Sequence, residues 1–508
     1  MSLQLLLLPV VGIIIFNLLR ALITPLRSVG GPFLARFTDL WYAWRVRVGR
    51  FEFENLELHK KYGTIVRYGP NRFSFNDPEA LKIIYGPGSQ FRKSDWYSAH
   101  NVPKPEAYER WSMFSTTDPK QHSEQRKPFT NAYSMTSLVS FEPYVDDCAN
   151  IFEQRLTEVA GTPVPIDFGH WLQCYAFDVI GDITFGERFG FLDSGRDIGG
   201  VMAALDGFFG YASTVGVFPS LHPYLFKLQG LLAGKEGTGF NYVNNFTQSQ
   251  INKFRDDPKR AEVASLQDEG SMETLLAKFF KRNQEDPNRF TSYHVFIGSG
   301  QNVGAGSDTT AISLSATFYY LLKNPSTLQK LREEIMTKEE QGQLSEQPTF
   351  KETLNMPYLQ AVIKESLRLH PATGLPLERV VPEGGATISG RFFPAGTIVG
   401  VNTWVEHRNP KIWGDDASEF KPERWLIDDA EKLSFMNRHW IPFGVGSRVC
   451  IGKNISLLEM QKLIPRVIRK FDLEIDGPRD KTWKTINRWF VKPQDFKVQV
   501  VLREKQTR

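Results

Sequence analysis

The sequence predicts a mainly α-helical protein with small β-sheets and an N-terminal membrane anchor. Long segments in the middle of the chain carry apolar residues at helical spacing, and shorter alternating segments lie before and after them. An uncharged apolar run stands near the N-terminus. We therefore expect a transmembrane anchor at 1–24, a linker rich in proline and glycine at 25–34, and a single large domain at 35–508.

The apolar run at 3–19 contains no charged side chain and can just span a bilayer as a helix. A cleaved signal peptide would need basic residues before the run and small residues at a cleavage site, and we find neither. Arg20, Arg27 and Arg36 follow the run instead, which favours a cytoplasmic location for the rest of the chain. The pattern predicts a retained single-pass anchor.

The rest of the chain alternates between sheet and helix signals. A hairpin is expected at 63–75, and alternating segments with glycine turns return at 379–402 and 489–502. Helical periodicity covers the segments between them, namely 139–159, 172–185, 273–282, 293–322, 325–338 and 358–369.

Composition excludes several classes of protein. The chain of 508 residues has 61 basic and 57 acidic residues mixed along it, so no nucleic-acid-binding surface is indicated. Its three cysteines are too few for a disulfide framework and fit a reducing compartment. Cys148 and Cys174 lack glycine, histidine or basic neighbours and are expected to be small structural residues.

The third cysteine, Cys450, lies in a distinctive loop. Residues 443–452 read Phe-Gly-Val-Gly-Ser-Arg-Val-Cys-Ile-Gly and match the pattern F-x-x-G-x-R-x-C-x-G at each fixed position. A thiolate here could bind iron, and the apolar helix that follows would favour the anion through its N-terminal dipole. Gly446 and Gly452 would let backbone amides approach the sulfur, and Phe443 would screen it from water. The alternative is an ordinary turn that holds a cysteine.

With this loop the chain resembles the cytochrome P450 superfamily, and the resemblance covers nearly the whole sequence. It implies the cytochrome P450 fold, a single haem domain with haem b as cofactor, and Cys450 as the proximal ligand of the iron. A further signature is Glu365-Ser-Leu-Arg368, which sets an acid and a base on one helical face. In the family this pair joins an arginine of a Pro-Glu-Arg motif, here Arg424, in a buried structural network.

The segment Gly304-Ala-Gly-Ser-Asp-Thr-Thr310 resembles the family's helix on the distal side of the haem. Two glycines within a helix are unfavourable, and close approach of a flat macrocycle explains them. The resemblance implies that Ala305 contacts the haem and that Asp308 and Thr309 relay protons to bound dioxygen. The alternative is that these polar side chains bond back to the helix backbone. The preceding Gly298-Ser-Gly300 imitates a dinucleotide fingerprint, but the second strand with its acidic residue is missing.

The resemblance also implies which residues compensate the haem propionates. His122 and Arg126 are spaced to lie on one helical face, although many members have Trp where this chain has His122. Arg379 and Arg448 match two further arginines of the family. Gly452, Phe443, Ala305 and Cys450 complete the expected haem contacts.

The phrases around Leu375 and Trp404 look like fungal enzymes of the pisatin-demethylase-like group. This implies a monooxygenase that inserts one oxygen atom from O2 into a lipophilic small molecule, by hydroxylation, O-demethylation or oxidative rearrangement, in specialised metabolism or detoxification. No flavin domain follows Arg508, so NADPH electrons should come from a separate cytochrome P450 reductase, with cytochrome b5 as a further donor. The substrate pocket should involve 97–117, 304–309 and 372–377. The expected location is the endoplasmic reticulum membrane, with the catalytic domain in the cytoplasm.

Two other functions stay open at this point. A haem-thiolate isomerase or dehydratase would use the same haem contacts without a reductase, although Asp308 and Thr309 argue for oxygen chemistry. A membrane-bound haem carrier would not be an enzyme. Consumption of NADPH and dioxygen through a reductase would separate the three.

Overall fold

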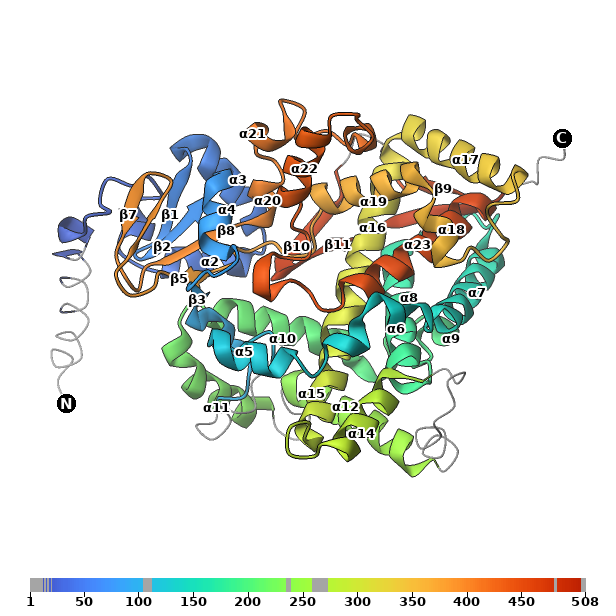
Figure 1. The fold of residues 1–508 in the computed structure, drawn as a ribbon, viewed down its shortest axis with the longest axis horizontal. Coiled ribbons are helices and arrows are strands. Elements are labelled where there is room, and N and C mark those ends of the chain that lie inside the picture. Colours follow the sequence, from blue (N-terminus) through green and yellow to red (C-terminus); the bar gives the residue numbers. More distant parts are fainter. Residues whose placement is uncertain are drawn as a thin grey trace.

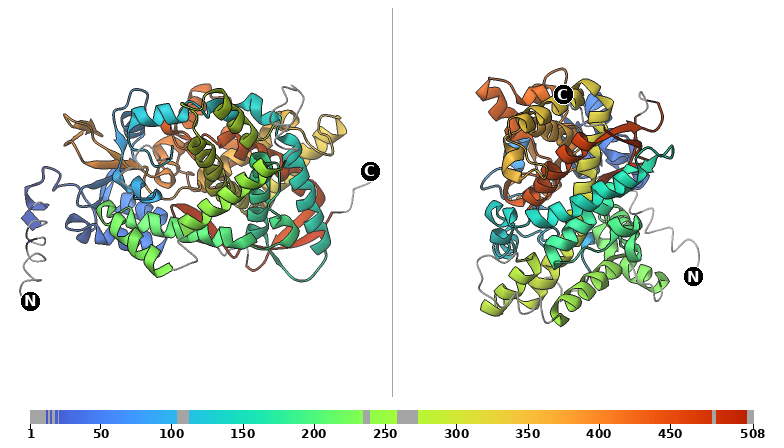
Figure 2. Two further views of the ribbon diagram at one scale, coloured as in Figure 1. Left: turned by 90° about the horizontal axis from the view of Figure 1, so that it is seen from below. Right: turned by 90° about the vertical axis from the view of Figure 1, so that its right-hand side faces the viewer.

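Helices dominate the middle of the chain and small sheets lie before and after them, as the sequence predicts (Figure 1). The structure is a computed structural model that describes residues 12, 15, 18, 19, 21–103, 112–233, 239–257, 273–478 and 482–503. The sheet-rich N-terminal part lies at one end of the long axis, and helix α17 (Pro325–Glu340) lies near the other, as the further views also show (Figures 1 and 2).

One long helical stretch runs through the middle of the molecule. It consists of α15 (Ser292–Gln301), a π-helical turn η8 (Asn302–Gly306) and α16 (Ser307–Lys323). The predicted helix at 293–322 is thus confirmed, apart from the π turn. α16 packs against α8 (Phe168–Phe185), α19 (Pro357–Leu369) and α23 (Lys453–Lys470).

The other long helices surround this stretch. α7 (Glu142–Val159) packs against α8 and α23, α14 (Leu275–Glu285) packs against α15 and α8, and α10 (Val201–Val215) packs against α12 (Gly239–Asp256). The shorter helices are α2 (Leu40–Val48), α3 (Phe51–Tyr62), α4 (Pro78–Tyr85), α5 (Pro119–Arg126), α6 (Met135–Val139), α9 (Phe191–Ser194), α11 (His222–Ala233), α18 (Phe350–Leu354), α20 (Thr403–Glu406), α21 (Pro410–Trp413) and α22 (Ala430–His439).

The largest sheet has five strands in the order β1-β2-β8-β5-β3. These are β1 (Ile65–Gly69), β2 (Arg72–Phe75), β8 (Ile398–Val401), β5 (Arg379–Val380) and β3 (Arg92–Lys93). The smaller sheets pair β6 (Ala386–Ile388) with β7 (Arg391–Phe393), β10 (Lys484–Arg488) with β11 (Phe490–Gln494), and β12 (Lys497–Leu502) with both β4 (Ile166–Asp167) and β9 (Phe471–Ile475). The predicted hairpin at 63–75 is confirmed as β1 and β2.

Local sequence explains where several elements begin. Asp118 accepts a hydrogen bond from Gln121 N at 2.6 Å, and Pro119 occupies the first turn of α5. The helix predicted at 139–159 is confirmed as α7, which begins at Glu142, while Val139 is the last residue of the separate helix α6. Pro143 in the first turn of α7 cannot continue an earlier helix.

The predicted anchor at 1–24 lies largely outside the described residues and stays a prediction. Within the described part of the chain, one helical stretch, Ile198–Val215, is long and apolar enough to cross a bilayer, but its α10 part packs against α2 and α12. The expected linker is held on the first sheet. Leu26 and Val29 are buried there, and Arg67 donates to Leu26 O at 2.6 Å.

Candidate functional site

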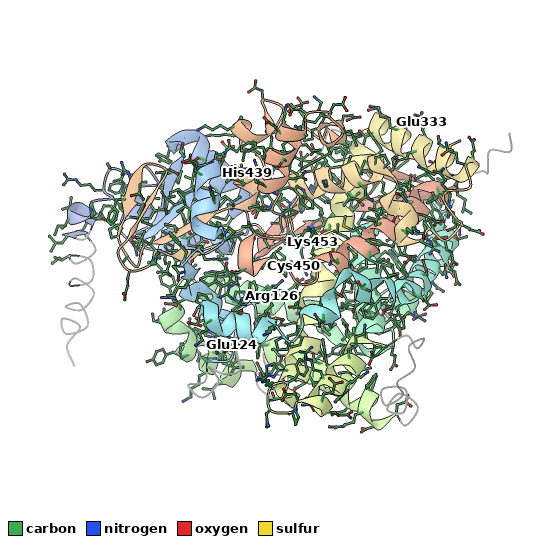
Figure 3. All side chains as sticks on the ribbon, in the orientation of Figure 1. Glu124, Arg126, Glu333, His439, Cys450 and Lys453 are labelled. Carbon is green, nitrogen blue, oxygen red and sulfur yellow. The ribbon has the colours of Figure 1, made fainter. Side chains whose placement is uncertain are left out.

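Cys450 lies in a tight loop between α22 and α23, near the middle of the molecule (Figure 3). Its backbone N–H donates to Phe443 O at 2.8 Å, which closes the loop. Gly446 has a φ of 67°, and a Cβ there would stand 2.1 Å from the carbonyl oxygen of Tyr85. The loop therefore needs glycine at 446 for its own packing. Our expectation that Gly446 makes room for amides beside the sulfur does not explain this position.

The sulfur stands at the N-terminus of α23. The N–H groups of Gly452 and Lys453 hydrogen-bond toward it and lower the pKa of the thiol, while burial raises that pKa more strongly. The ring of Phe443 is half-buried and packs edge-on against Trp440. Cys148 and Cys174 are buried, whereas Cys450 keeps an accessible surface. A residue that is surrounded by protein and still accessible borders an open interior.

The π turn borders the same interior. Ala305 is exposed, although Val303 and Ser307 next to it in the helix are buried. Tyr133 lies between this turn and the cysteine. Its hydroxyl donates to Asn302 at 2.6 Å. Burial raises the pKa of Tyr133, and the charge of Cys450 raises it further.

Helix packing explains one of the two glycines of the turn. A Cβ at Gly306 would stand 2.9 Å from the side chain of Ile180 on α8, so Gly306 allows close helix packing. A Cβ at Gly304 would stand 3.7 Å from Leu205 on α10, which is an ordinary contact. The expectation that Gly304 allows close approach of a macrocycle therefore stays a prediction.

Asp308 and Thr309 point in different directions. The hydroxyl of half-buried Thr309 donates to Ala305 O at 2.7 Å, the backbone contact that we considered as the alternative. Asp308 is 1% exposed and accepts a hydrogen bond from Gln173 at 2.6 Å. Lys492 lies 2.7 Å from its other oxygen. The sequence identified neither Gln173 nor Lys492, because both contacts are distant in sequence.

The four residues expected at the propionates lie in one electrostatic group, the cation cluster, which also contains Lys93. Its members are Lys93, His122, Arg126, Arg379 and Arg448. The three arginines donate to backbone carbonyls, namely Arg126 to Val449 at 2.7 Å, Arg379 to Glu378 at 2.9 Å and Arg448 to Thr116 at 2.8 Å. Among the described residues, no carboxylate forms an ion pair with any member of the cluster.

Mutual repulsion within the cation cluster shifts its pKa values. Burial and then Arg448 lower the pKa of His122 to about 3. Burial and then Arg379 lower the pKa of Arg448 to about 10. The nearby Glu378 cannot compensate these charges, since Arg72 occupies it at 2.5 Å.

Lys93 was not found by sequence reasoning. It is 6% exposed, and its ammonium lies 4.0 Å from the ring centre of Tyr97 and 4.4 Å from that of Phe114. Burial and then the charges of Arg379 and Arg448 lower its pKa well below the usual value. A basic residue in a two-residue strand carries no motif, so only the pairing of β3 with β5 brings it to Arg379.

These observations test whether a haem would fit. Among the described residues no carboxylate forms an ion pair with the cation cluster, and the two propionates of a haem would supply such partners. Cys450 offers an accessible sulfur as an iron ligand, and Ala305 is accessible as well. The donor set fits iron protoporphyrin IX.

The structure brings Glu365, Arg368 and Arg424 together in what we call the glutamate network. Both carboxylate oxygens of Glu365 accept from Arg368 at 2.8 Å, and Arg424 donates to one of them at 2.8 Å. The side chains of Glu365 and Arg368 are 0% exposed. Trp425 also donates to Glu365 at 3.0 Å, a contact that the motif did not predict.

His407 links the glutamate network to the cysteine loop. Its Nδ1 lies 2.9 Å from Arg368 O, and its Nε2 accepts from Ile441 N at 2.9 Å. Because Nε2 accepts, Nδ1 must donate to the carbonyl. Ile441 is two residues before Phe443, so the network fixes the start of the loop.

The β10–β11 hairpin forms part of the expected pocket region. Gly374 N donates to Trp489 O at 2.9 Å, and Phe490 packs edge-on against Phe209 of α10 at 4.7 Å between ring centres. Phe114 contacts Trp489 at 5.7 Å. Residues 104–111 of the expected pocket lie outside the described part of the chain.

A cysteine sulfur at a helix N-terminus, an exposed alanine in a π turn and a cluster of cations without a carboxylate partner among the described residues are together typical of a haem-thiolate protein. Comparison with known proteins agrees. Residues 40–500 match the cytochrome P450 family model. A pisatin demethylase of Fusarium vanettenii is 41% identical over 491 residues, with 95% of this chain and 91% of the relative covered. The chain belongs to the cytochrome P450 family.

Other relatives are fungal monooxygenases. A cytochrome P450 monooxygenase of Aspergillus terreus is 39% identical over 465 residues, covering 91% of this chain and 93% of the relative. The cytochrome P450 monooxygenase cicH of Emericella nidulans is 39% identical over 480 residues, covering 94% of each chain. Membership in this family makes the protein an oxidoreductase with a haem cofactor.

Proposed function

We propose that this protein is a monooxygenase that inserts one oxygen atom from O2 into a lipophilic small molecule in fungal specialised metabolism or detoxification. The single observation that carries this proposal is the Cys450 loop beside an uncompensated cation cluster, in a chain similar throughout to fungal monooxygenases. Hydroxylation, oxidative rearrangement and O-demethylation are the candidate reactions, and the pisatin demethylase relative favours a test of O-demethylation first.

In this proposal, Cys450 supplies the iron ligand and the chain holds the haem on both faces. The haem would supply the site at which dioxygen is bound and split. Phe443 screens the sulfur, the N–H of Gly452 stabilises its negative charge, and Ala305 borders the opposite face. Arg126, Arg379, Arg448, Lys93 and His122 hold the propionates.

Thr309 would deliver protons to the oxygen site. Its hydroxyl reaches the interior beside Ala305 and can rotate away from the Ala305 carbonyl. Asp308 stays buried behind it and cannot touch the oxygen site in this arrangement, so it acts through other groups.

A separate NADPH–cytochrome P450 reductase would supply the electrons, with cytochrome b5 as a further donor. Arg126 and Lys453 flank Cys450 (Figure 3). Cations near the sulfur support docking of an acidic redox protein on this face.

The membrane proposal joins the predicted anchor at 1–24 with helix α11. Several large apolar side chains of α11 are exposed, with Leu231 at 73% and Leu232 at 78%. We propose a single-pass protein of the endoplasmic reticulum with residues 35–508 as a cytoplasmic haem domain. Removal of residues 2–23, which spares buried Leu26, should release the protein from membranes. Full-length protein in the soluble fraction would contradict the proposal.

The thiolate ligand is tested by the carbon monoxide spectrum of the reduced protein. We expect the red-shifted Soret band of thiolate-ligated haem in the wild type and its loss in Cys450→Ala. Cys148→Ala and Cys174→Ala are matched controls that should keep the band, since both residues are buried in the core. Loss of the band in a control, with retention in Cys450→Ala, would show that the ligand is another cysteine.

The reaction class is tested with the purified protein, a fungal reductase and NADPH. A monooxygenase should consume NADPH and dioxygen, with pisatin and 7-methoxycoumarin as aryl ether probes for product. Thr309→Ala should keep NADPH consumption but form more hydrogen peroxide and less product. A wild type that consumes neither NADPH nor dioxygen would favour the isomerase or dehydratase alternative.

A further inference from the structure

A lysine outside the central helix holds the acid of the proposed proton relay. Asp308 accepts from Gln173 of α8 at 2.6 Å, and the ammonium of Lys492 on β11 lies 2.7 Å from its second oxygen. The contact with Lys492 is an ion pair without the alignment of a hydrogen bond. Residues of two other elements therefore occupy both carboxylate oxygens.

Lys492 also has a second carboxylate partner. Its ammonium forms an ion pair with Asp206 on α10. The side chain of Asp206 is 59% exposed, that of Lys492 is 17% exposed and that of Asp308 is fully buried. Lys492 thus bridges an acid at the surface and an acid in the interior, and it joins the hairpin, α10 and α16.

Lys492 is the charged partner of the Asp308 side chain. A buried carboxylate needs an opposite charge or hydrogen bonds beside it, and Gln173 supplies a hydrogen bond but no charge. Lys492 is the only cation in ion-pair contact with Asp308 among the described residues. Asp308 and then Asp206 raise the pKa of Lys492 against the effect of its burial, so the lysine stays charged.

Thr309 does not determine the orientation of the Asp308 side chain. Consecutive residues of a helix point about 100° apart, and Thr309 is bonded to Ala305 O rather than to Asp308. The position of the acid relative to the alcohol therefore depends on Lys492 and Gln173.

We propose that Lys492, oriented by Asp206, is a positioning residue that holds the Asp308 side chain in place for proton delivery and makes that delivery depend on helix α10. This inference rests on the proposed monooxygenase function. It assigns the β10–β11 hairpin a part in the chemistry, although Lys492 itself does not touch the oxygen site.

The test measures how much NADPH the purified protein oxidises for each dioxygen consumed, with reductase present and no organic substrate. Reduction of O2 to hydrogen peroxide takes one NADPH and one further proton, whereas reduction to two waters takes two NADPH and two protons. Lys492→Met should raise the peroxide fraction about threefold or more, because protons arrive too slowly. The conservative Lys492→Arg should restore most of the wild-type ratio. Lys484→Met, on the same hairpin but exposed, is the matched control.

Asp206→Asn tests the link to α10. It should shift the ratio in the same direction as Lys492→Met but by less, and the double variant should be no worse than Lys492→Met alone. Each ratio is normalised to the amount of haem that shows the carbon monoxide band of thiolate ligation. Partly folded protein then does not contribute to the ratio. A Lys492→Met variant with the wild-type ratio, beside an Asp308→Asn variant with an altered ratio, would overturn the proposal. Additive effects of Asp206→Asn and Lys492→Met would overturn the link to α10.

A second readout does not depend on turnover. In the wild-type background, Lys492→Met should lower the melting temperature by several degrees. In the Asp308→Asn background the same substitution should lower it clearly less, because no buried carboxylate then loses its partner. Equal shifts in both backgrounds would contradict the ion pair. A wild type that oxidises no NADPH with reductase would instead overturn the proposed function, and the melting comparison would still decide the ion pair.

Discussion

Two buried groups of cations differ in how their charge is compensated. In the glutamate network, Arg368 meets Glu365 twice at 2.8 Å, and Arg424 meets both Glu365 and Asp416. In the cation cluster, Arg126, Arg379 and Arg448 meet carbonyl oxygens, and their charges repel one another. The first group contains its own carboxylates, whereas the second has no ion pair with a carboxylate in the part of the chain that the structure describes.

The difference separates a structural part from a binding part. Removal of one partner of a compensated buried pair leaves the other charge unpaired and destabilises the fold. Cations without anions cost free energy until a ligand brings the opposite charge. Variants of the two groups should therefore differ in what they change, which is stability for the first and haem retention for the second.

The largest effect is expected from Arg368→Ala. The variant leaves Glu365 buried with only part of its compensation, at about 3 to 5 kcal/mol of unfolding free energy, so little holoprotein should form. Chemical denaturation and haem content measure this. Lys330→Ala, which breaks the exposed ion pair with Glu423, should cost less than about 1 kcal/mol. Normal haem content with slow turnover in Arg368→Ala would mean that the network is catalytic.

Arg448→Met should affect haem more than folding. Loss of a charge-assisted hydrogen bond to a propionate should speed transfer of haem to an acceptor protein about tenfold or more. The unfolding free energy of the apoprotein should change by less than about 1 kcal/mol, since the repulsion from Arg379 is relieved as contacts to carbonyls are lost. A large loss of apoprotein stability would show that the cation cluster contributes to folding in the same way as the glutamate network.

Lys93→Met sharpens the comparison with a smaller effect. The lysine lies beside two aromatic rings, and burial lowers its pKa. Methionine can therefore replace the apolar part of the side chain while the amino group is removed. Haem transfer should become about threefold faster. Lys93→Arg should retain haem as the wild type does. An unchanged transfer rate in Lys93→Met would remove Lys93 from the cluster.

The smallest effect concerns pH and His122. Its folded pKa of about 3 is below the unfolded value, so its contribution to apoprotein stability is present above pH 6.5 and is lost as the pH falls toward 3. His122→Phe should therefore make the apoprotein less sensitive to acid, by about 1 kcal/mol between pH 6.5 and 5 after allowance for partial solvation. Denaturation at both pH values measures this. Equal acid sensitivity of the variant and the wild type would mean that burial and the neighbouring cations do not lower the pKa of His122.

The sequence predicted those parts of the site that have local patterns. His122 and Arg126 are four residues apart and lie on one face of a helix. Cys450 lies in a fixed motif, and Glu365 and Arg368 are three residues apart. Long-range contacts left no such pattern. Lys492 is 184 positions after Asp308, and Lys93 reaches Arg379 only through strand pairing.

The glycines show packing contacts that the sequence did not predict. Gly306 accommodates the side chain of Ile180, and Gly446 accommodates the carbonyl of Tyr85. Which surface a missing Cβ faces depends on the rotation of the helix, and the spacing of residues along the chain does not determine that rotation across a π turn.

The π turn at Asn302–Gly306 acts as a phase shift in the central helix. A π turn is equivalent to one residue inserted into a regular α-helix, so everything after it is rotated by about 100° relative to everything before it. Gly298, packed against Phe129, and Asp308, paired with Lys492, each occupy their own surroundings only because of that offset. Deleting a single residue within the turn would bring both halves into one register, which would turn the acid out of its pocket while leaving every residue of the relay in the sequence.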